Sequence, residues 1–222
     1  MKNVIITGAS GSLGSAVVER FLEASWRVIA VDREPNAAKA DSVHHLSADL
    51  SDFDAVENLF TEVDKLGEVD AVVHCAGGFR FSNTDQISND DIDFLLNANF
   101  KSSVLVARES LKRLKASGRG HLVFISSVTS LGPGAGVGVY GASKAAINAL
   151  VDGIAAEVKD SGINVHAVLP SIIDTAPNRK DMPDADHDTW VKTQDLAEVI
   201  FALTTPAFKA VRKSLIPVTA GT

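Results

Sequence analysis

Three polar side chains, Ser127, Tyr140 and Lys144, have the types and spacing that proton transfer to a carbonyl oxygen requires. Tyr140 and Lys144 occur in Tyr-Gly-Ala-Ser-Lys, and residues four apart share one face of a helix. A phenol has an ordinary pKa near about 10, and a neighbouring cation lowers it. We therefore expect Tyr140 to act as general acid in reduction and general base in oxidation, tuned by Lys144. Ser127 lies upstream, before a glycine-rich segment (132–138), and would hold the substrate oxygen.

A glycine-rich segment between an expected strand and an expected helix opens the chain, and it supplies the second chemical feature. Gly8 permits a tight turn, while Gly11 and Gly14 let backbone approach a pyrophosphate without a Cβ in the way. The free N–H groups of the following helix then point at the phosphates. The segment predicts a dinucleotide-binding turn. Its expected contact residues are Gly8, Ser10, Gly11, Ser12, Leu13 and Gly14.

Acidic residues after the second and third expected strands bear on the adenosine half of such a ligand. Asp32 follows the second strand, where a carboxylate accepts hydrogen bonds from the ribose and repels a 2′-phosphate. This favours NAD(H), while the adjacent Arg33, which could hold that phosphate, keeps NADP(H) as the alternative. Asp49, followed by Leu50, could accept from the adenine amine. Ser51 or Asp52 could instead cap the next helix.

The fourth expected strand runs into Cys75-Ala76-Gly77-Gly78. The small residues Ala76, Gly77 and Gly78 would let the cofactor lie close to the strand ends. Cys75 is interpreted as a small core residue, because nothing nearby marks a reactive thiolate. A lone cysteine cannot form an internal disulfide, which suits a reducing cytoplasm.

Short runs rich in Val and Ile alternate with longer helical patterns, which predicts an α/β fold with a parallel sheet. Right-handed crossovers would make it a single-domain, Rossmann-like, doubly wound sheet of about seven strands with helices on both faces, spanning 1–222. The expected strands are Val4–Thr7, Arg27–Val31, Val43–Leu46, Asp70–His74, His121–Ser126, Ile163–Leu169 and Ser214–Val218. The expected helices are Leu13–Ala24, Phe53–Lys65, Asp90–Ser117, Gly138–Asp160 and Gln194–Leu203. Thr175–Trp190 is expected to be an irregular, functional loop.

The composition excludes several other classes of protein. The net charge of −7 argues against a nucleic-acid partner, and the hydrophobic fraction of 45% is enough for a substantial core. No run of about 18 apolar residues implies a membrane span, and the N-terminus resembles no signal peptide. His187 and its acidic neighbours form a charged loop without supporting contacts, so we expect no metal site.

These residues together resemble the short-chain dehydrogenase/reductase family over essentially the whole chain. The resemblance implies an NAD(P)-dependent oxidoreductase with a Ser–Tyr–Lys site, in which Lys144 also binds the nicotinamide ribose and Asn99 completes the catalytic set. It also implies that Pro170, Ile173 and Thr175 follow the sixth strand near the nicotinamide carboxamide. His74-Cys75-Ala76-Gly77 departs from the family's usual Asn-Asn-Ala-Gly, and Ser171 stands where the family usually has glycine.

The loop 174–190 is similar to the corresponding stretch of dihydropteridine reductases, which use NADH to reduce quinonoid dihydropterin. Its Asn-Arg-Lys, Met-Pro and Ala-Asp pieces and its closing tryptophan carry this similarity, with Gly77-Gly78-Phe79. Phe79 and Trp190 would flank a flat substrate, or merely pack under a loop. Ser127 departs from those enzymes and favours the alternative, a general carbonyl reductase or secondary-alcohol dehydrogenase.

A dinucleotide-sensing regulator without turnover is the third hypothesis, but such a protein would be expected to lose Tyr140 or Lys144. The family resemblance further implies a homodimer or homotetramer, assembled through the helices that hold Asn99 and Tyr140. Alanines on the second helix would allow close helix approach, or could pack on the chain's own sheet. The expected partner is otherwise a small-molecule substrate.

Overall fold

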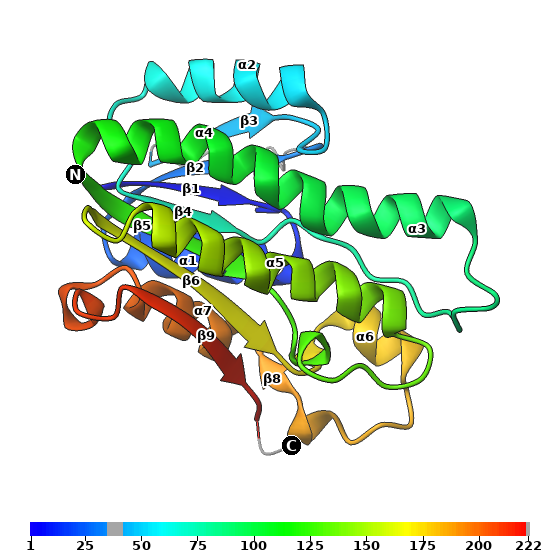
Figure 1. Ribbon diagram of the computed structural model, residues 1–222. Coiled ribbons are helices and arrows are strands. Elements are labelled where there is room, and N and C mark those ends of the chain that lie inside the picture. The colour runs from blue at the N-terminus through cyan, green and yellow to red at the C-terminus, as the bar shows by residue number, and fades with distance from the viewer. Residues whose placement is uncertain (35–41, 221–222) are drawn as a thin grey trace.

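The computed structural model describes residues 1–34 and 42–220. Its centre is a parallel seven-stranded sheet of order β3-β2-β1-β4-β5-β6-β9 (Figure 1). The chain builds one half of the sheet outward from β1, returns to β4, and builds the other half in the opposite direction. The prediction of a doubly wound parallel sheet with helices on both faces is confirmed.

The elements follow the expected alternation of strands and helices. The sheet consists of β1 (Asn3–Thr7), β2 (Arg27–Asp32), β3 (Val43–Ser47), β4 (Ala71–His74), β5 (Arg119–Ile125), β6 (Gly162–Pro170) and β9 (Lys213–Val218). The main helices are α1 (Ser12–Glu23), α2 (Phe53–Asp64), α3 (Asn89–Leu95), α4 (Ser102–Ser117), α5 (Gly138–Glu157) and α7 (Thr193–Ala202). Among the described helices, none combines the length and apolar character that crossing a membrane requires.

Two apolar layers cover the sheet because successive side chains of a strand point to opposite faces. Ile5 of β1 packs into the layer under α2, α4 and α5, whereas its neighbours Val4 and Ile6 pack into the layer under α1 and α7. In Figure 1, α4 and α5 lie in front of the sheet and α1 and α7 behind it. Strands buried on both faces explain the continuous apolar runs in the sequence.

The helix expected over 90–117 carries a defect at its centre. Between α3 and α4, residues Leu96–Lys101 form a π-helical turn within one continuous rod (Figure 1). The hydroxyls of Ser102 and Ser103 donate to the carbonyls of Ala98 and Asn99, at 2.7 and 2.6 Å. Such side-chain bonds to the preceding turn compete with regular helical bonding, and π turns are frequent at functional sites. Asn99 lies within this turn.

The segment expected to be irregular, 175–190, is more ordered than the sequence suggests. It leaves from β7 (Ile173–Asp174) and returns at β8 (Val191–Lys192), and these two short strands pair in parallel. Between them, Thr175 caps the short helix α6 (Ala176–Asp181), which has Pro177 in its first turn. Helix-start signals were present, but the charged composition hid them.

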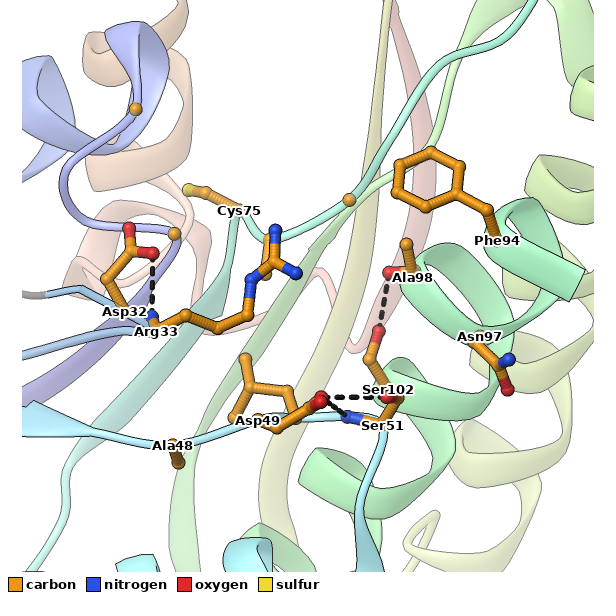
Figure 2. Close-up of a pocket in the computed structure, with 15 residues that line it drawn as sticks. Asp32, Arg33, Ala48, Asp49, Ser51, Cys75, Phe94, Asn97, Ala98 and Ser102 are labelled. Atoms are coloured by element: carbon orange, nitrogen blue, oxygen red, sulfur yellow. Dashed lines mark hydrogen bonds between the residues drawn. The ribbon is translucent and has the colours of Figure 1, made fainter. Parts of the chain in front are cut away.

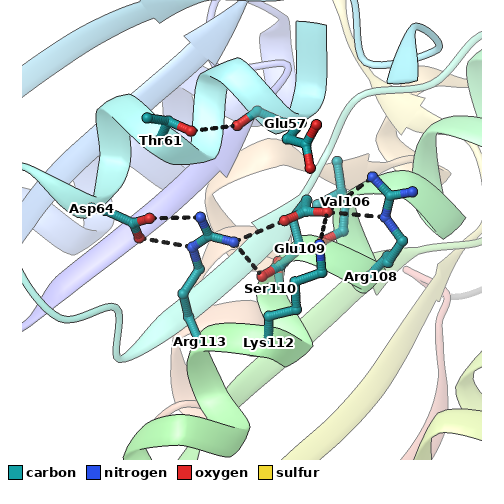
Figure 3. Close-up of polar contacts among 9 residues, drawn as sticks. All are labelled: Glu57, Thr61, Asp64, Val106, Arg108, Glu109, Ser110, Lys112 and Arg113. Atoms are coloured by element: carbon teal, nitrogen blue, oxygen red, sulfur yellow. Dashed lines mark hydrogen bonds and ion pairs between the residues drawn. The ribbon is translucent and has the colours of Figure 1, made fainter. Parts of the chain in front are cut away.

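A network of ion pairs joins α2 to α4 beside the sheet (Figure 3). Glu109, 2% exposed, pairs with Arg108, Lys112 and Arg113 at 2.9, 2.7 and 2.9 Å. Arg113 in turn makes a bidentate pair with Asp64 of α2. Burial would raise the pKa of Glu109, but the three cations hold it below its ordinary value. The buried carboxylate is therefore satisfied, and it fixes α4 against α2.

Candidate active site

A cavity of about 410 Å³ opens at the carboxyl ends of the strands, where the chain reverses its direction of winding (Figure 2). In open α/β sheets, ligands bind at this switch point. The sequence-predicted residues that line the cavity are Gly8, Gly11, Asp32, Arg33, Asp49, Leu50, Ala76 and Gly77. The loops after four neighbouring strands thus bring these predicted residues together.

The glycine-rich turn after β1 has the close backbone contacts that its glycines predict. Gly8 has a φ of +64°, in the left-handed region that favours glycine. A Cβ on Gly14 would lie 2.0 Å from the Gly8 carbonyl oxygen, so no side chain fits there. Helix α1 starts after Gly11 without a side-chain cap, and an uncapped N-terminus beside the cavity suits a pyrophosphate. Ser10, Ser12 and Leu13 belong to this turn and the first turn of α1.

The end of the cavity beside β2 and β3, where adenosine is expected, carries one cation between two carboxylates. Asp32, at the end of β2, accepts from the backbone N–H groups of Ser10 and Arg33 at 3.0 and 2.8 Å. The Asp49 carboxylate accepts from the backbone and hydroxyl of Ser51, and these bonds, with the Arg33 charge, lower its pKa. Figure 2 shows the Arg33 side chain extending across the cavity between the two carboxylates. Of the two residues expected as possible caps, Asp52 rather than Ser51 caps α2.

Ser127, Tyr140 and Lys144 converge beyond the other end of this cavity. Ser127 follows β5, and its hydroxyl hydrogen-bonds to Tyr140, near the start of α5. Thr129 fixes that hydroxyl, since its backbone N–H and its Oγ1 donate to Ser127 Oγ at 3.2 and 2.9 Å. The Lys144 ammonium lies 5.9 Å from the centre of the Tyr140 ring. The spacing in the sequence therefore does bring the three groups to one place.

The electrostatics of Tyr140 differ from the sequence-based expectation. Burial raises the pKa of Tyr140, and the hydrogen bond from Ser127 opposes that rise only in part. Lys144 donates to the carbonyl of Ile125 at 3.0 Å, and burial lowers its pKa to about 8. Lys144 is therefore not among the groups that set the pKa of Tyr140, and its ammonium is directed at the Ile125 carbonyl instead.

Asn99 joins the loop that follows β4 to α5, the helix that carries Tyr140 and Lys144. Its side-chain amide donates to the Gly78 carbonyl and to Ser143 Oγ, both at 3.0 Å, and its Oδ1 accepts from the Gly78 N–H at 2.9 Å. A Cβ on Gly77 would lie 2.8 Å from Asn99 Oδ1 and 3.2 Å from Lys144 Nζ. A larger residue at position 77 would therefore press on the Asn99 and Lys144 side chains beside the cavity.

The two aromatic residues expected to flank a substrate have different surroundings. Phe79 is 52% exposed, and its ring meets the Tyr140 ring edge to face, with centroids 4.9 Å apart. Trp190 is only 3% exposed and packs against His187. The indole fills the underside of its loop and offers no face to a ligand. We correct the expectation for Trp190 accordingly, whereas Phe79 stays in the candidate site.

The segment expected near the nicotinamide follows β6, which ends at Pro170. The carbonyl of Ile173, in β7, accepts from the Asn178 side chain at 2.8 Å. The Thr175 hydroxyl accepts from the Asn178 backbone at 3.3 Å, as the cap of α6. Local bonds to Asn178 thus hold both groups in this structure, and their role toward a ligand stays a prediction.

Sequence reasoning missed several residues that the structure places in or beside the site. Ser143 links Asn99 to the Tyr140 carbonyl, to which its hydroxyl donates at 2.7 Å. Two features of the sequence could have identified these residues. Ser143 directly precedes Lys144, and Thr129 follows Ser127 by two positions. In the described part of the chain, no group of three or more His, Cys, Asp and Glu side chains gathers as a metal site. The unpredicted cavity-lining residues are Ala48, Ser51, Cys75, Phe94, Asn97, Ala98 and Ser102.

Comparison with known proteins adds to this geometry. Residues 2–186 match the sequence profile of the short chain dehydrogenases. An uncharacterized oxidoreductase of Staphylococcus aureus strain USA300 is 27% identical over 214 residues, which cover 92% of both chains. One from Staphylococcus epidermidis is 26% identical over 216 residues, covering 93% of this chain and 92% of the other.

Two solved structures show the same architecture. A 4-hydroxyisoleucine dehydrogenase complexed with NADH has a TM-score of 0.93 and 27% identity, and the match covers 100% of this chain and 98% of that one. ElxO with NADP bound has a TM-score of 0.92 and 24% identity, covering 99% of this chain and 98% of the other. The second likeness concerns the fold alone.

Proposed function

The chain belongs to the short-chain dehydrogenase family and is an NAD(P)-dependent oxidoreductase, and from this premise we propose that it uses NADH to reduce a small-molecule substrate, with Tyr140 as the proton donor. One observation carries the proposal: Ser127, Tyr140 and Lys144 gather next to a cavity whose loops suit a dinucleotide. The bound cofactor supplies hydride transfer at its nicotinamide ring.

The side chains have separate roles in this proposal. Ser127 holds the substrate oxygen, and Tyr140 donates the proton to it as negative charge develops. Burial raises the pKa of Tyr140, so the phenol carries the proton that a general acid donates in reduction. Lys144 binds the cofactor ribose, and Asn99 holds the loop at Gly78 against the catalytic helix. Pro170, Ile173 and Thr175 contact the carboxamide end.

The preference for NADH rests on Asp32. Its carboxylate lines the cavity at the end of β2, where the charge of a 2′-phosphate would be repelled. The N–H groups of Ser10 and Arg33 fix that carboxylate in place. Arg33 supports the alternative, because its guanidinium reaches across the same cavity and could pair with a phosphate (Figure 2). The dehydrogenase neighbour is complexed with NADH, which is a property of that protein.

For the substrate, we propose a flat ring system of the dihydropterin type, placed against Phe79. Phe79 is about half exposed and lies beside the Tyr140 ring, so it offers a flat substrate an aromatic surface at the reacting centre. Ser127 supports the second candidate, a simple ketone or the corresponding secondary alcohol, because a serine hydroxyl beside the phenol suits any carbonyl oxygen. With Trp190 buried, the aromatic support comes from one side only.

The test is NADH oxidation with quinonoid dihydropterin, run beside a panel of simple ketones and quinones, with NADPH as second reductant. Faster turnover with the pterin supports the ring-system proposal, and Phe79→Ala should then raise its KM at least fivefold. Phe81→Ala, at a nearby exposed ring, is the matched control. Turnover with simple carbonyls alone removes the pterin proposal, and absence of NADH oxidation with every substrate contradicts the proposed function.

We also propose that the enzyme is a homodimer or homotetramer assembled through α4 and α5. Ala142 and Ala149 of α5 are exposed, and nothing lies near the Cβ position of Gly153 on the same helix. Small exposed residues allow close helix approach. Light scattering should give a multiple of the 23.4 kDa chain mass, and Ala149→Arg should shift it toward the monomer. A wild-type monomer would contradict this proposal.

A further inference from the structure

The structure assigns a positioning role to His74, a residue that stands where the family usually has asparagine. His74 ends β4, is 2% exposed, and contacts one hydroxyl on each side. Its Nδ1 lies 2.8 Å from Thr7 Oγ1 of β1, and its Nε2 lies 3.1 Å from Ser102 Oγ of α4. The ring thus links β1, which precedes the glycine-rich turn, to α4, which follows the π turn that carries Asn99.

The direction of each hydrogen bond follows from the hydroxyl protons. Ser102 has one proton and donates it to the Ala98 carbonyl at 2.7 Å (Figure 2), so it must accept from His74 Nε2–H. Nδ1 is then bare and accepts the Thr7 proton. Thr7 Oγ1 also accepts from the Ala76 N–H at 3.3 Å. The result is one chain of four bonds, from Ala76 through Thr7, His74 and Ser102 to Ala98.

The two ends of this chain lie in the two halves of the site. Ala76 is beside the glycine turn, since a Cβ on Gly8 would lie 2.8 Å from the Ala76 nitrogen. Ala98 belongs to the π turn and directly precedes Asn99, whose amide reaches Gly78 and Ser143. We propose that the Thr7 bond of His74 sets the cofactor turn and the Ser102 bond sets the Asn99 turn. Burial and the nearby Lys144 charge lower the pKa of His74 to about 3, so the ring stays neutral.

Two substitutions separate the two bonds. In His74→Asn, the shorter amide can replace Nδ1 and keep the Thr7 bond, but it cannot reach Ser102. In His74→Gln, the longer amide can replace Nε2 and keep the Ser102 bond, but it loses Thr7. This inference rests on the proposed hydride transfer, so the activity measurements presuppose that the wild-type enzyme oxidises NADH with a carbonyl substrate.

We expect His74→Asn to lower kcat about tenfold with the KM for NADH within twofold of wild type. Ser102→Ala should do the same, and the double variant should lose no more than either single variant, because both remove one bond. His74→Gln should keep kcat within twofold and raise the KM for NADH. A purely structural role would lower stability in all variants and leave kcat per folded molecule equal.

The proposal is overturned if His74→Asn and Ser102→Ala both keep kcat within twofold of the wild-type value. A second measurement is independent of turnover: ¹⁵N chemical shifts of the wild-type protein should show His74 neutral, with its proton on Nε2, from pH 5 to 8. A proton on Nδ1 would also overturn the proposal. If the wild-type chain oxidises no NADH while the Nε2–H tautomer is present, the proposed function fails and the hydrogen-bond chain stands.

Discussion

At the scale of single residues, the site depends on groups whose neighbours set their behaviour. Tyr140 and Lys144 match the sequence pattern, but Lys144 is held by the Ile125 carbonyl and Tyr140 is governed by burial. A spacing of four residues predicts proximity on a helix. The spacing does not say which backbone carbonyl will accept a hydrogen bond from a buried ammonium. Similarly, the sequence identified Asp32, whereas the reach of Arg33 across the cavity became visible only in the fold.

The first prediction concerns cofactor choice. Asp32→Ser removes the charge that opposes a 2′-phosphate and keeps a small polar group for the ribose. The ratio of kcat/KM for NADPH to that for NADH should rise at least about tenfold, which corresponds to about 1.4 kcal/mol. Steady-state kinetics with both reductants measures this ratio. Arg33→Gln is the companion variant and should lower the NADPH value selectively, and an unchanged ratio in Asp32→Ser would refute the role of Asp32.

At the scale of elements, two segments differ from the sequence-based prediction, and in both a side chain hydrogen-bonds to nearby backbone. The hydrophobic period predicted a single helix over 90–117, but Ser102 and Ser103 bond back to the π turn that carries Asn99. The segment 175–190 looked irregular because its charges mask the Thr175 cap. Trp190 looked like a substrate contact, yet whether an aromatic ring turns inward depends on the tertiary cavity beneath it. Strands and helices with continuous apolar runs, by contrast, were predictable.

The second prediction concerns the ion network between α2 and α4. Glu109→Gln keeps the side-chain shape but removes the charge that balances Arg108, Lys112 and Arg113 (Figure 3). Because these cations are partly exposed, the loss is smaller than for a fully buried pair, and we expect about 1–3 kcal/mol lower stability. Urea denaturation measures it.

The matched control for Glu109 is Glu57→Gln, the same exchange at an exposed position of α2 in the same region. It should change the free energy of unfolding by less than about 0.5 kcal/mol. Equal effects of the two substitutions would show that the network does not fix α4 against α2.

At the scale of the whole molecule, the sheet holds three histidines as neutral rings, of which His74 and His166 are buried and His121 is partly buried. Burial lowers the pKa of His74 to about 3, and that of His121 and His166 to about 4. His166 Nδ1 lies 2.8 Å from Ser214 Oγ, so this ring joins β6 to β9. In the unfolded chain a histidine takes up a proton near pH 6.5, whereas these rings stay neutral. Below pH 6.5 the folded state therefore binds fewer protons than the unfolded state.

The third prediction follows from that difference in proton binding. The unfolded state binds more protons below pH 6.5, so the free energy of unfolding should fall as the pH decreases from about 6.5 toward 4. The full effect is present above pH 6.5, and each pH unit below that value removes up to about 1.4 kcal/mol for every histidine that stays neutral in the fold. Urea titrations at pH 7.5, 6 and 5 measure the slope. His166→Asn keeps an acceptor for Ser214 and should flatten it, and equal wild-type stability at the three pH values would disprove the account.

The most direct test of the central claim compares the wild-type enzyme with Tyr140→Phe. We expect NADH oxidation with the best substrate to fall at least about 100-fold, the usual contribution of a general acid. The dissociation constant for NADH, measured by fluorescence, should stay within threefold, because the cavity residues are untouched. Turnover near the wild-type rate in Tyr140→Phe would contradict the assignment of Tyr140 as the proton donor.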